Sequence, residues 1–314
     1  MLRLFVLNAT REFGSRIAAA LGCEPAPHEE REFEDGEHKA RPLISVHGDD
    51  VYVVQSLHGD ARGTADERLV RLLFFAATLR DHDAARVTAV IPYLAYGRKD
   101  RRTQPFDPVN SRYVAQLIEA AGVGRVLALE VHNVAAFDNA FRIPALHISA
   151  APVLAAAAAR MACDAKVVVA SPDPGGVKRA QLFREALEPL LGRECGSAYL
   201  EKRRARGVVS GSLLAGDVRD TTVVLVDDLI STGNTLVRAA RTCLAQGALS
   251  VTAYAAHGLF APGADAAMLD PSLSRIVVTD SVAPERLGAE ARAKLQIESV
   301  APAFAAAIKA WHEQ

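Results

Sequence analysis

Cysteine is scarce in this 314-residue sequence, and the four cysteines that occur are widely spaced. Cys23, Cys163, Cys195 and Cys243 form no Cys-x-x-Cys pair, the spacing used by many zinc sites and redox motifs. We therefore expect neither a zinc site nor a disulfide framework. Reduced and mostly buried thiols are the expectation.

Long apolar runs are also missing. The apolar run within residues 1–8 is too short for a signal peptide and predicts a first strand instead. Residues 150–162 are rich in alanine, but Pro152 and Arg160 interrupt them, which argues against a membrane span. We expect a soluble, cytoplasmic protein without a membrane partner.

Net charge is close to zero, because 36 basic residues are balanced by 37 acidic ones. Such a balance gives no general attraction to nucleic acid or to an anionic membrane. Any phosphate binding must therefore come from local clusters. Half of the residues are hydrophobic, which at this length allows a large core and predicts two domains rather than one.

Short runs rich in β-branched residues alternate with helical patterns along the chain. Apolar residues within 69–79 recur at helical spacing, and Thr64 with Glu67 predicts a capping box at the start of that helix. Further helices are predicted over about 235–245 and 301–312. Strands are predicted at residues 51–54, 87–92, 127–131, 167–170, 223–226, 250–255 and 276–279.

The alternation of strand and helix predicts an α/β fold with mostly parallel sheets covered on both faces. The two halves repeat this order although their residues differ, which indicates two related domains joined near residues 144–152. We place the first domain at residues 1–147, the second at 148–300 and a terminal helix within 301–314.

The strongest functional signal lies in residues 223–236. Two carboxylates, Asp227 and Asp228, follow the predicted strand. A loop of small residues then opens a helix: Ser231, Thr232, Gly233, Asn234 and Thr235. Ligands of open α/β sheets bind at the carboxyl ends of strands, and a helix N-terminus suits a phosphate.

The acidic pair adds a second specificity to this loop. Two carboxylates can accept hydrogen bonds from a vicinal diol or lie near a magnesium ion. Phosphate and diol together describe ribose 5-phosphate. The alternative interpretation of the same residues is a polar, acidic turn followed by small residues that simply begin a helix.

Residues 223–236 resemble the phosphoribosyl-diphosphate-binding motif shared by type I phosphoribosyltransferases and ribose-phosphate diphosphokinases. Five further segments occur in the order seen in the diphosphokinases, namely residues 33–37, 96–102, 130–132, 171–176 and 202–204. The chain is thus similar to that family over essentially its whole length. The resemblance implies two tandem domains like those of type I phosphoribosyltransferases, with ATP on the first and ribose 5-phosphate on the second.

The resemblance also implies a reaction. The family moves the β,γ-diphosphate of ATP onto the anomeric hydroxyl of ribose 5-phosphate and releases AMP, with magnesium as cofactor. His132 and Asp173 match the magnesium-contacting positions, although an imidazole is an unusual magnesium ligand and could act through water or contact ATP. Lys202 and Arg204 match two basic residues placed on the transferring phosphates, on an arm expected to be a mobile loop.

Nucleotide recognition is implied in the first half. Arg98, Asp100 and Arg101 match the ATP-binding loop of the family, and guanidinium forks suit polyphosphate. Asp35 and Glu37 match positions that contact adenine from a neighbouring subunit. A homo-oligomer, a hexamer in the family, is therefore implied. Without the resemblance, these residues would be interpreted as an exposed basic loop and an acidic turn.

Several positions depart from the family pattern. Lys99, inside the ATP-binding loop, replaces a common glutamine, and an ammonium lacks the acceptor of an amide. The stretch after Arg102 lacks the basic, serine-rich loop of the phosphate-activated class, so effectors are expected to act weakly. Ser231 stands where an acidic residue is common, and His47 replaces a usual arginine. These shifts resemble divergent or non-allosteric members.

Two other functions remain open at this point. A phosphoribosyltransferase would share the loop of residues 223–236, but the ATP-side motifs of the first half argue against it. A non-catalytic regulatory homologue would share the fold, but the residues matched to the site are all present.

Overall fold

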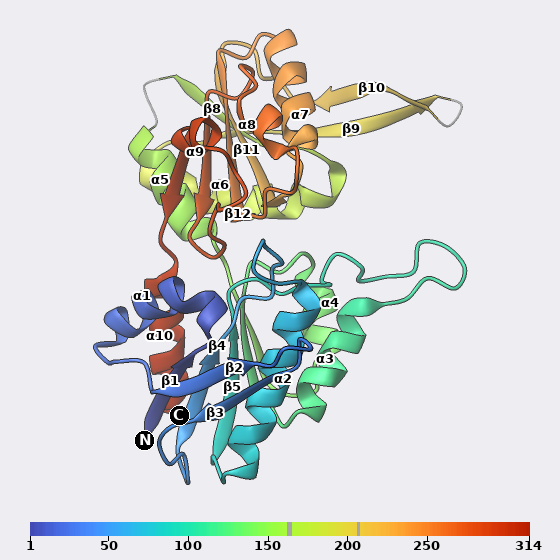
Figure 1. The fold of residues 1–314 in the computed structure, drawn as a ribbon. Helices are drawn as coiled ribbons and strands as arrows, with labels where there is room; N and C mark the ends of the chain where they lie inside the picture. The colour runs from blue at the N-terminus through green and yellow to red at the C-terminus, as the bar shows by residue number, and fades with distance from the viewer. Residues whose placement is uncertain (162–164, 206–207) are drawn as a thin grey trace. The chain divides into compact units, whose positions relative to one another are not determined.

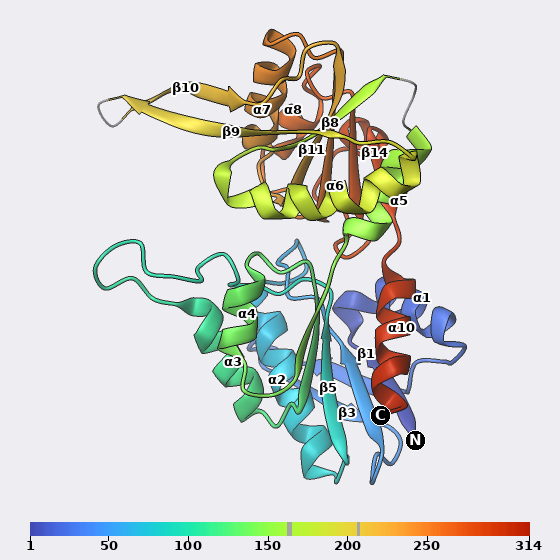
Figure 2. The ribbon, with the colours of Figure 1, turned by 180° about the vertical axis from the view of Figure 1, so that it is seen from behind.

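A computed structural model describes residues 1–161, 165–205 and 208–314. The chain divides into two units, Met1–Ile148 with Val300–Gln314, and Ser149–Ser299. Each unit is built on its own sheet with helices on both faces, as Figures 1 and 2 show. Within the described residues, no helix is long and apolar enough to cross a membrane.

The first unit has a five-stranded parallel sheet in the order β1-β4-β5-β6-β7. Its strands are β1 (Leu2–Val6), β4 (Asp50–Val54), β5 (Arg86–Ile91), β6 (Arg125–Leu129) and β7 (Ala145–Ile148). Its helices are α1 (Arg11–Leu21), α2 (Ala65–Asp81), α3 (Asn110–Ala120), α4 (Val134–Ala140) and α10 (Ala301–His312), with a short 3-10 turn η1 (Asn8–Thr10). A separate antiparallel hairpin contains β2 (His28–Glu32) and β3 (His38–Pro42).

Successive side chains of a strand point to opposite faces of the sheet, and this divides the core of the first unit into two layers. Val51 and Val53 of β4 belong to a buried cluster with α2, α3 and α4, whereas Tyr52 and Val54 face the other side. Helices α1 and α10 cover that second face (Figure 1). The predicted capping box is confirmed, because Thr64 and Glu67 exchange hydrogen bonds at the start of α2.

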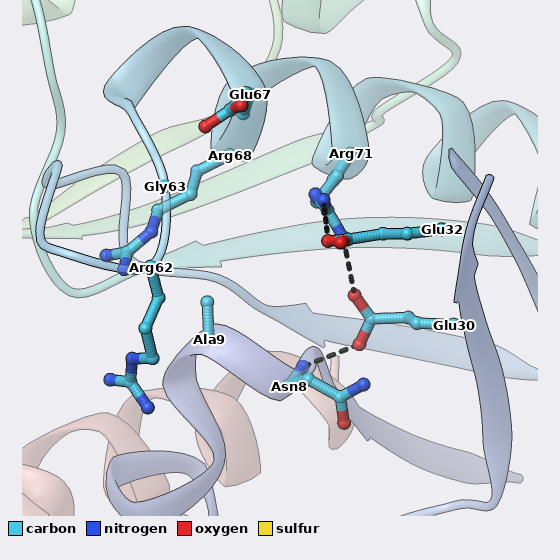
Figure 3. A pocket seen from close by; sticks show the side chains of 9 residues that line it. All are labelled: Asn8, Ala9, Glu30, Glu32, Arg62, Gly63, Glu67, Arg68 and Arg71. Atoms are coloured by element: carbon cyan, nitrogen blue, oxygen red, sulfur yellow. Dashed lines mark hydrogen bonds and ion pairs between the residues drawn. The ribbon is translucent and has the colours of Figure 1, made fainter. Parts of the chain in front are cut away.

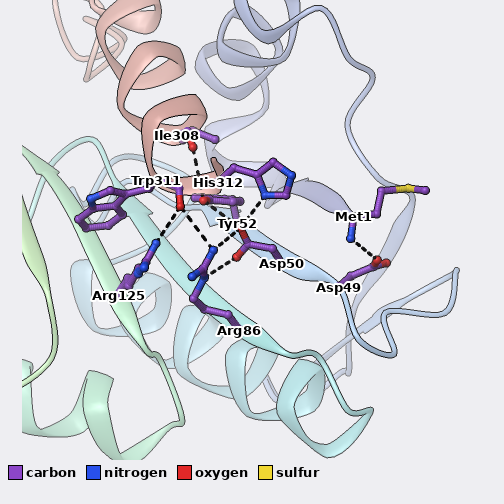
Figure 4. A network of polar contacts seen from close by, with 9 residues as sticks. All are labelled: Met1, Asp49, Asp50, Tyr52, Arg86, Arg125, Ile308, Trp311 and His312. Atoms are coloured by element: carbon purple, nitrogen blue, oxygen red, sulfur yellow. Dashed lines mark hydrogen bonds and ion pairs between the residues drawn. The ribbon is translucent and has the colours of Figure 1, made fainter. Parts of the chain in front are cut away.

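The C-terminal helix α10 returns to the first unit. Its Phe304 stacks edge-on against Phe13 of α1, with ring centroids 5.6 Å apart. Near its end, His312 Nδ1 lies 2.8 Å from Asp50 Oδ2, and Arg86 donates two hydrogen bonds to the same carboxylate (Figure 4). The residues after 300 therefore complete the core of the N-terminal half.

The second unit has a seven-stranded sheet in the order β10-β9-β8-β11-β12-β13-β14, parallel except for the β9–β10 pair. Its strands are β8 (Lys166–Ser171), β9 (Gly196–Ala205), β10 (Val208–Ala215), β11 (Thr221–Ile230), β12 (Ser250–Gly258), β13 (Arg275–Thr279) and β14 (Leu295–Glu298). Its helices are α5 (Ala151–Met161), α6 (Val177–Leu191), α7 (Asn234–Ala245), α8 (Ala264–Met268) and α9 (Ala289–Ala293), with a 3-10 turn η2 (Pro174–Gly176).

Both faces of the second sheet are buried. Val223 and Leu225 of β11 join a cluster with α7, α8 and α9, while Tyr254 of β12 packs against Phe183 of α6 on the other face, with ring centroids 5.5 Å apart. The strands of a parallel sheet that is covered on both faces have continuous apolar sequences. This is why the strand at residues 223–226 could be predicted from the sequence.

Two sequence-based expectations need correction here. Strand β11 does not end at Val226 but continues to Ile230, because these residues pair with β12 up to Gly258. The segment around Lys202 is not a loop, since β9 reaches Ala205 and pairs with β10.

Three of the four cysteines lie in the described residues. Cys23, Cys195 and Cys243 are free thiols, and the last two are buried. Cys163 lies outside the described part of the chain.

Candidate functional site

The strand order of the second unit reverses between β8 and β11, which are parallel neighbours. From β8 the chain passes through α6 to β9 on one side, and from β11 it passes through α7 to β12 on the other. Connections that leave in opposite directions open a crevice at the carboxyl ends of the two strands, where open α/β sheets bind ligands. The residues after β8 and at the end of β11 are therefore the structural candidates for a site.

The acidic pair lies at this point. The Asp228 side chain is 6 % exposed and that of Asp227 23 %, and Arg179 Nη1 of α6 lies 3.8 Å from an oxygen of each. The backbone N–H of Asp228 donates to Asp227 Oδ1 at 2.9 Å. Burial and the neighbouring Asp228 raise the pKa of Asp227 well above its usual range, and Arg179 opposes that rise. The Arg179 guanidinium thus lies beside both carboxyl groups of the pair.

Arg179 was missed in the sequence. It follows the turn after β8 by only a few residues, and a lone arginine in the first turn of a helix has no distinctive pattern. Its Nη1 also lies near Gly176, 3.7 Å from the position that a Cβ would occupy there. Arg179 therefore lies close to both strand ends.

The loop between β11 and α7 requires glycine at position 233. Gly233 has a φ of +78°, a conformation that L side chains rarely adopt. A Cβ there would lie 2.8 Å from the Cβ of Ala267 and 2.4 Å from Met268 Cε. Helix α7 begins directly after it, so the first N–H groups of the helix and the exposed Thr232 and Asn234 lie together. This is the geometry expected of a phosphate loop.

Asp173 occupies the turn after β8. Its Oδ1 accepts hydrogen bonds from the N–H groups of Gly175 at 2.9 Å and Gly176 at 3.2 Å. Ser171 Oγ donates to the Asp173 carbonyl at 2.6 Å. The carboxylate is therefore held in one orientation at the crevice. Within the described residues, no three His, Cys, Asp or Glu side chains form a ready-made metal cluster.

In the first unit, the structure brings two predicted segments together. Strands β5 and β6 are parallel neighbours, so the loop with Arg98, Asp100 and Arg101 and the segment with His132 both follow the same edge of the sheet. Asn133 Nδ2 donates to Asp100 Oδ2 at 2.6 Å and thereby ties the two segments. The adjacency of these segments depends on the strand order and could not be read from the sequence.

Lys99 is bound within its own loop. Its Nζ contacts the Asp107 carboxylate and donates to Thr103 Oγ1 at 3.1 Å. The same Asp107 oxygen accepts the N–H groups of Thr103 and Gln104, and these contacts together lower the pKa of Asp107. The ammonium that replaces the usual glutamine therefore orders the stretch after Arg102.

Asp35 and Glu37 lie elsewhere in the first unit, in the exposed turn between β2 and β3. Asp35 Oδ1 accepts the N–H of Glu37 at 3.1 Å, which shapes the turn. Among the described residues, neither carboxylate pairs with the arginines at 98 and 101. Within one chain, these two predicted positions are not joined to the ATP-binding loop.

Lys202 and Arg204 lie on β9, opposite Ser212 and Val209 of β10. Their side chains are outside the described part of the chain. The two strands form a long ribbon at the edge of the sheet, next to β8 in the strand order (Figure 1). An arm is thus present at these positions, built as a hairpin.

Known proteins match both units. The model described as the N-terminal domain of ribose phosphate pyrophosphokinase matches residues 2–122, and the phosphoribosyl transferase domain model matches residues 149–279. A ribose-phosphate pyrophosphokinase of Caldanaerobacter subterraneus subsp. tengcongensis is 36 % identical over 99 % of this chain and 95 % of its own length. The chain belongs to the ribose-phosphate pyrophosphokinase family.

Other members of this enzyme family agree in length and fold. The ribose-phosphate pyrophosphokinase of Agrobacterium fabrum is 35 % identical over 98 % of this chain and 96 % of its own. The crystal structure of phosphoribosylpyrophosphate synthetase from Mycobacterium smegmatis superposes with a TM-score of 0.88 at 28 % identity and covers 99 % of both chains. The expected pair of phosphoribosyltransferase-type domains is confirmed.

Proposed function

We propose that this chain transfers the β,γ-diphosphate of ATP to the anomeric hydroxyl of ribose 5-phosphate, giving phosphoribosyl diphosphate and AMP. The observation that carries this proposal is the switch point of the second unit. There a phosphate loop, an acidic pair and the Asp173 turn meet at the ends of β8 and β11. A phosphate site and a diol site side by side would fit ribose 5-phosphate.

Ribose 5-phosphate would be held at both ends. Its phosphate would accept hydrogen bonds from the residues of the loop, namely Ser231, Thr232, Gly233, Asn234 and Thr235. Its two ring hydroxyls would donate to Asp227 and Asp228. Because Arg179 neutralises part of the negative charge of this pair, the incoming diphosphate would meet less repulsion. The sugar would thus be oriented before reaction, which is a large part of catalysis in such transfers.

ATP would bind on the first unit. Arg98 and Arg101 would contact the polyphosphate, with Asp100 and Lys99 shaping the loop around it. His132, on the neighbouring strand end, would contact ATP directly or through a water. Asp35 and Glu37 would contact the adenine of a neighbouring subunit, so the site requires a homo-oligomer, proposed as a hexamer from the family resemblance.

Magnesium fits the residues that are present. The ion usually keeps several waters and takes one or two carboxylates plus substrate phosphates. Asp173, held by two backbone N–H groups, would supply one such carboxylate in the second unit. His132, in the first unit, is the other position that the family resemblance implies for magnesium. When bound, the ion would neutralise charge on the diphosphate. Lys202 and Arg204 would add positive charge from β9 as the diphosphate moves. We propose that the enzyme works in the cytoplasm.

One experiment tests this assignment. The pure chain is incubated with magnesium, ATP and ribose 5-phosphate, and AMP and phosphoribosyl diphosphate are measured. Equal amounts of the two products are expected without any nucleobase. Binding of ribose 5-phosphate without AMP formation would instead identify a non-catalytic homologue. Diphosphate release that depends on an added nucleobase would identify a phosphoribosyltransferase.

A further inference from the structure

The loops that follow the strands are held in different ways in the two units. In the first unit, side chains around a polar pocket of about 410 Å³ hold the turn η1 after β1 (Figure 3). Glu30 accepts the N–H of Asn8 at 2.6 Å. Arg71 of α2 pairs with Glu32 and lies 4.0 Å from Glu30. In the second unit, backbone hydrogen bonds hold the phosphate loop after β11.

The segment that follows β12 donates these hydrogen bonds. The N–H groups of Leu259 and Phe260 both donate to the carbonyl of Ile230, each at 3.0 Å. The N–H of Ala261 donates to the carbonyl of Ser231, also at 3.0 Å. The contact between β11 and β12 therefore continues past the last paired residues of the two strands.

These hydrogen bonds fix the direction of N–H groups in the phosphate loop. In a planar trans peptide unit, the N–H points opposite to the C=O. No cis peptide bond occurs in the described part of the chain. Because the carbonyls of Ile230 and Ser231 point toward residues 259–261, the N–H groups of Ser231 and Thr232 point away from them. The segment after β12 thus orients two potential phosphate donors.

Phe260 is the unusual residue of this segment. Its φ is +43°, in the left-handed region that a bulky side chain rarely adopts. Its side chain is 1 % exposed and belongs to the buried cluster of the second unit, together with Ile230. Such strain persists only where the surrounding structure enforces it, and it is frequent at ligand sites.

The ring of Phe260 is packed closely against the end of β12. A Cβ added at Gly258 would lie 2.3 Å from Phe260 Cε2, a distance that real Cβ contacts essentially never show. The buried ring therefore requires glycine at that position. This close packing leaves the backbone of residues 258–260 little room for another conformation.

We propose that Phe260 is a positioning residue for the phosphate of ribose 5-phosphate. Its ring and its left-handed backbone hold its own N–H and that of Ala261 against the loop. The resulting hydrogen bonds direct the N–H groups of Ser231 and Thr232 toward the phosphate, and Phe260 itself does not touch the ligand. This role rests on the proposed function, because it requires that the loop binds this phosphate.

Calorimetric titration of the full-length chain with ribose 5-phosphate, and separately with ATP, tests this role. Phe260→Leu keeps an apolar side chain but removes the ring, so the segment should relax from its left-handed conformation. The affinity for ribose 5-phosphate should fall at least about tenfold, the effect of one lost hydrogen bond to a charged group. The affinity for ATP should be unchanged.

Phe183→Leu is the matched control. Phe183 is also 1 % exposed and lies in the same unit, where it packs against Tyr254 on the opposite face of the sheet. The same substitution there should lower the melting temperature to a similar extent. It should leave the affinity for ribose 5-phosphate at the value of the parent.

A second variant acts without disturbing the core. Ala261→Pro removes the N–H that donates to Ser231, at a partly exposed position, and leaves the buried ring of Phe260 in place. It should also weaken ribose 5-phosphate binding while ATP binding is retained. This variant decides the question if Phe260→Leu does not fold.

Two results would overturn the positioning role alone. The first is that Phe260→Leu and Ala261→Pro both bind ribose 5-phosphate as tightly as the parent. The second is that Phe183→Leu weakens this binding as much as Phe260→Leu, which would identify a general loss of packing. If the parent itself does not bind ribose 5-phosphate, the proposed function fails and the positioning role fails with it.

Discussion

The two units share the same local order of strands and helices, but only the second sheet reverses its strand order. In the first, β1, β4, β5, β6 and β7 follow one another in a single direction. In the second, the direction changes between β8 and β11. Similar elements thus produce two different strand orders, and of the two described sheets the second contains a switch point, the place where open α/β sheets bind ligands.

The consequence lies in how the candidate residues are held. In the second unit, Asp227 and Asp228 belong to a central strand, and Arg179 contacts both. In the first, Lys99 and Asp100 are in a partly exposed loop tied by Asp107 and Asn133. We therefore expect substitutions in the second unit to have the larger effects.

The largest effect is expected on β9. Lys202→Ala and Arg204→Ala should each lower kcat by about 10²–10³, the usual loss when one preorganised charge partner is removed. KM values should move far less, because on the proposed role these charges would act mainly as the transition state forms. The double variant should be less than additive, since both serve one charge centre. Steady-state kinetics with both substrates measure this.

Arg203→Ala is the control on the same strand. If it is as damaging as its neighbours, the run is a general electrostatic patch. If all three variants keep full turnover, these β9 side chains have no part in the reaction. The expectation that substitutions in the second unit have the larger effects would then depend on the acidic pair alone.

The acidic pair should give the next largest effect. Asp227→Asn with Asp228→Asn should weaken ribose 5-phosphate binding, because loss of a charged hydrogen bond is worth about 1.5–3 kcal/mol. KM for ribose 5-phosphate should rise, and KM for ATP should change little. Asp220→Asn, at the opposite end of β11, is the matched control. If the kinetic constants of the double variant are unchanged, the acidic pair does not bind ribose 5-phosphate.

The same pair should make stability depend on pH. The folded pKa of Asp227 is raised, so the folded chain retains a proton that the unfolded chain loses above its ordinary pKa of about 4. Stability from this group is therefore lost as pH rises from about 4 toward the folded pKa. Asp227→Asn should therefore be more stable than the parent at pH 7 and should unfold at a higher temperature. The free energy of unfolding should rise by at least about 1 kcal/mol, the equivalent of a pKa shift of about one unit.

Thermal unfolding between pH 5 and 8 measures this difference, which should shrink as the pH is lowered. Arg179→Gln should act in the opposite direction, because it removes the cation that opposes the raised pKa. A difference between Asp227→Asn and the parent that is constant with pH would show that the pair does not titrate as expected.

A smaller effect is expected in the first unit. Asn133→Ala removes both the cap of α4 and the hydrogen bond to Asp100. Loss of the cap should destabilise the chain by about 1 kcal/mol. Without this hydrogen bond, Asp100 and its loop should be held less firmly. KM for ATP should therefore rise, without a comparable change in KM for ribose 5-phosphate. Equal changes in both constants would mean that the two units do not divide the substrates as proposed.

The smallest effect should come from inorganic phosphate. The stretch after Arg102 is not the basic, serine-rich loop of the phosphate-activated class. In it, the Asp107 carboxylate accepts hydrogen bonds from Lys99 and from two backbone N–H groups. Activity should therefore change little when phosphate is added to an assay in another buffer. Negligible activity without phosphate and a steep rise on its addition would contradict this.

The sequence alone was enough for much of the fold. Buried parallel strands such as β11 and the capped helix α2 were visible because they depend on local patterns: apolar runs, helical spacing and capping residues. The loop around Gly233 was recognisable for the same reason, since a strand, a small-residue loop and a helix follow one another directly. The identities of Asp227 and Asp228 were part of this signal.

Other features depended on the tertiary structure. Arg179 contacts the acidic pair only because β8 and β11 are neighbours, and the β9–β10 ribbon exists only because two separate segments pair. Phe304 of helix α10 packs on Phe13 of α1 although most of the chain lies between the two helices. Periodicity and capping describe what each segment forms, whereas strand order and long-range packing decide which segments meet, and no local pattern encodes that choice.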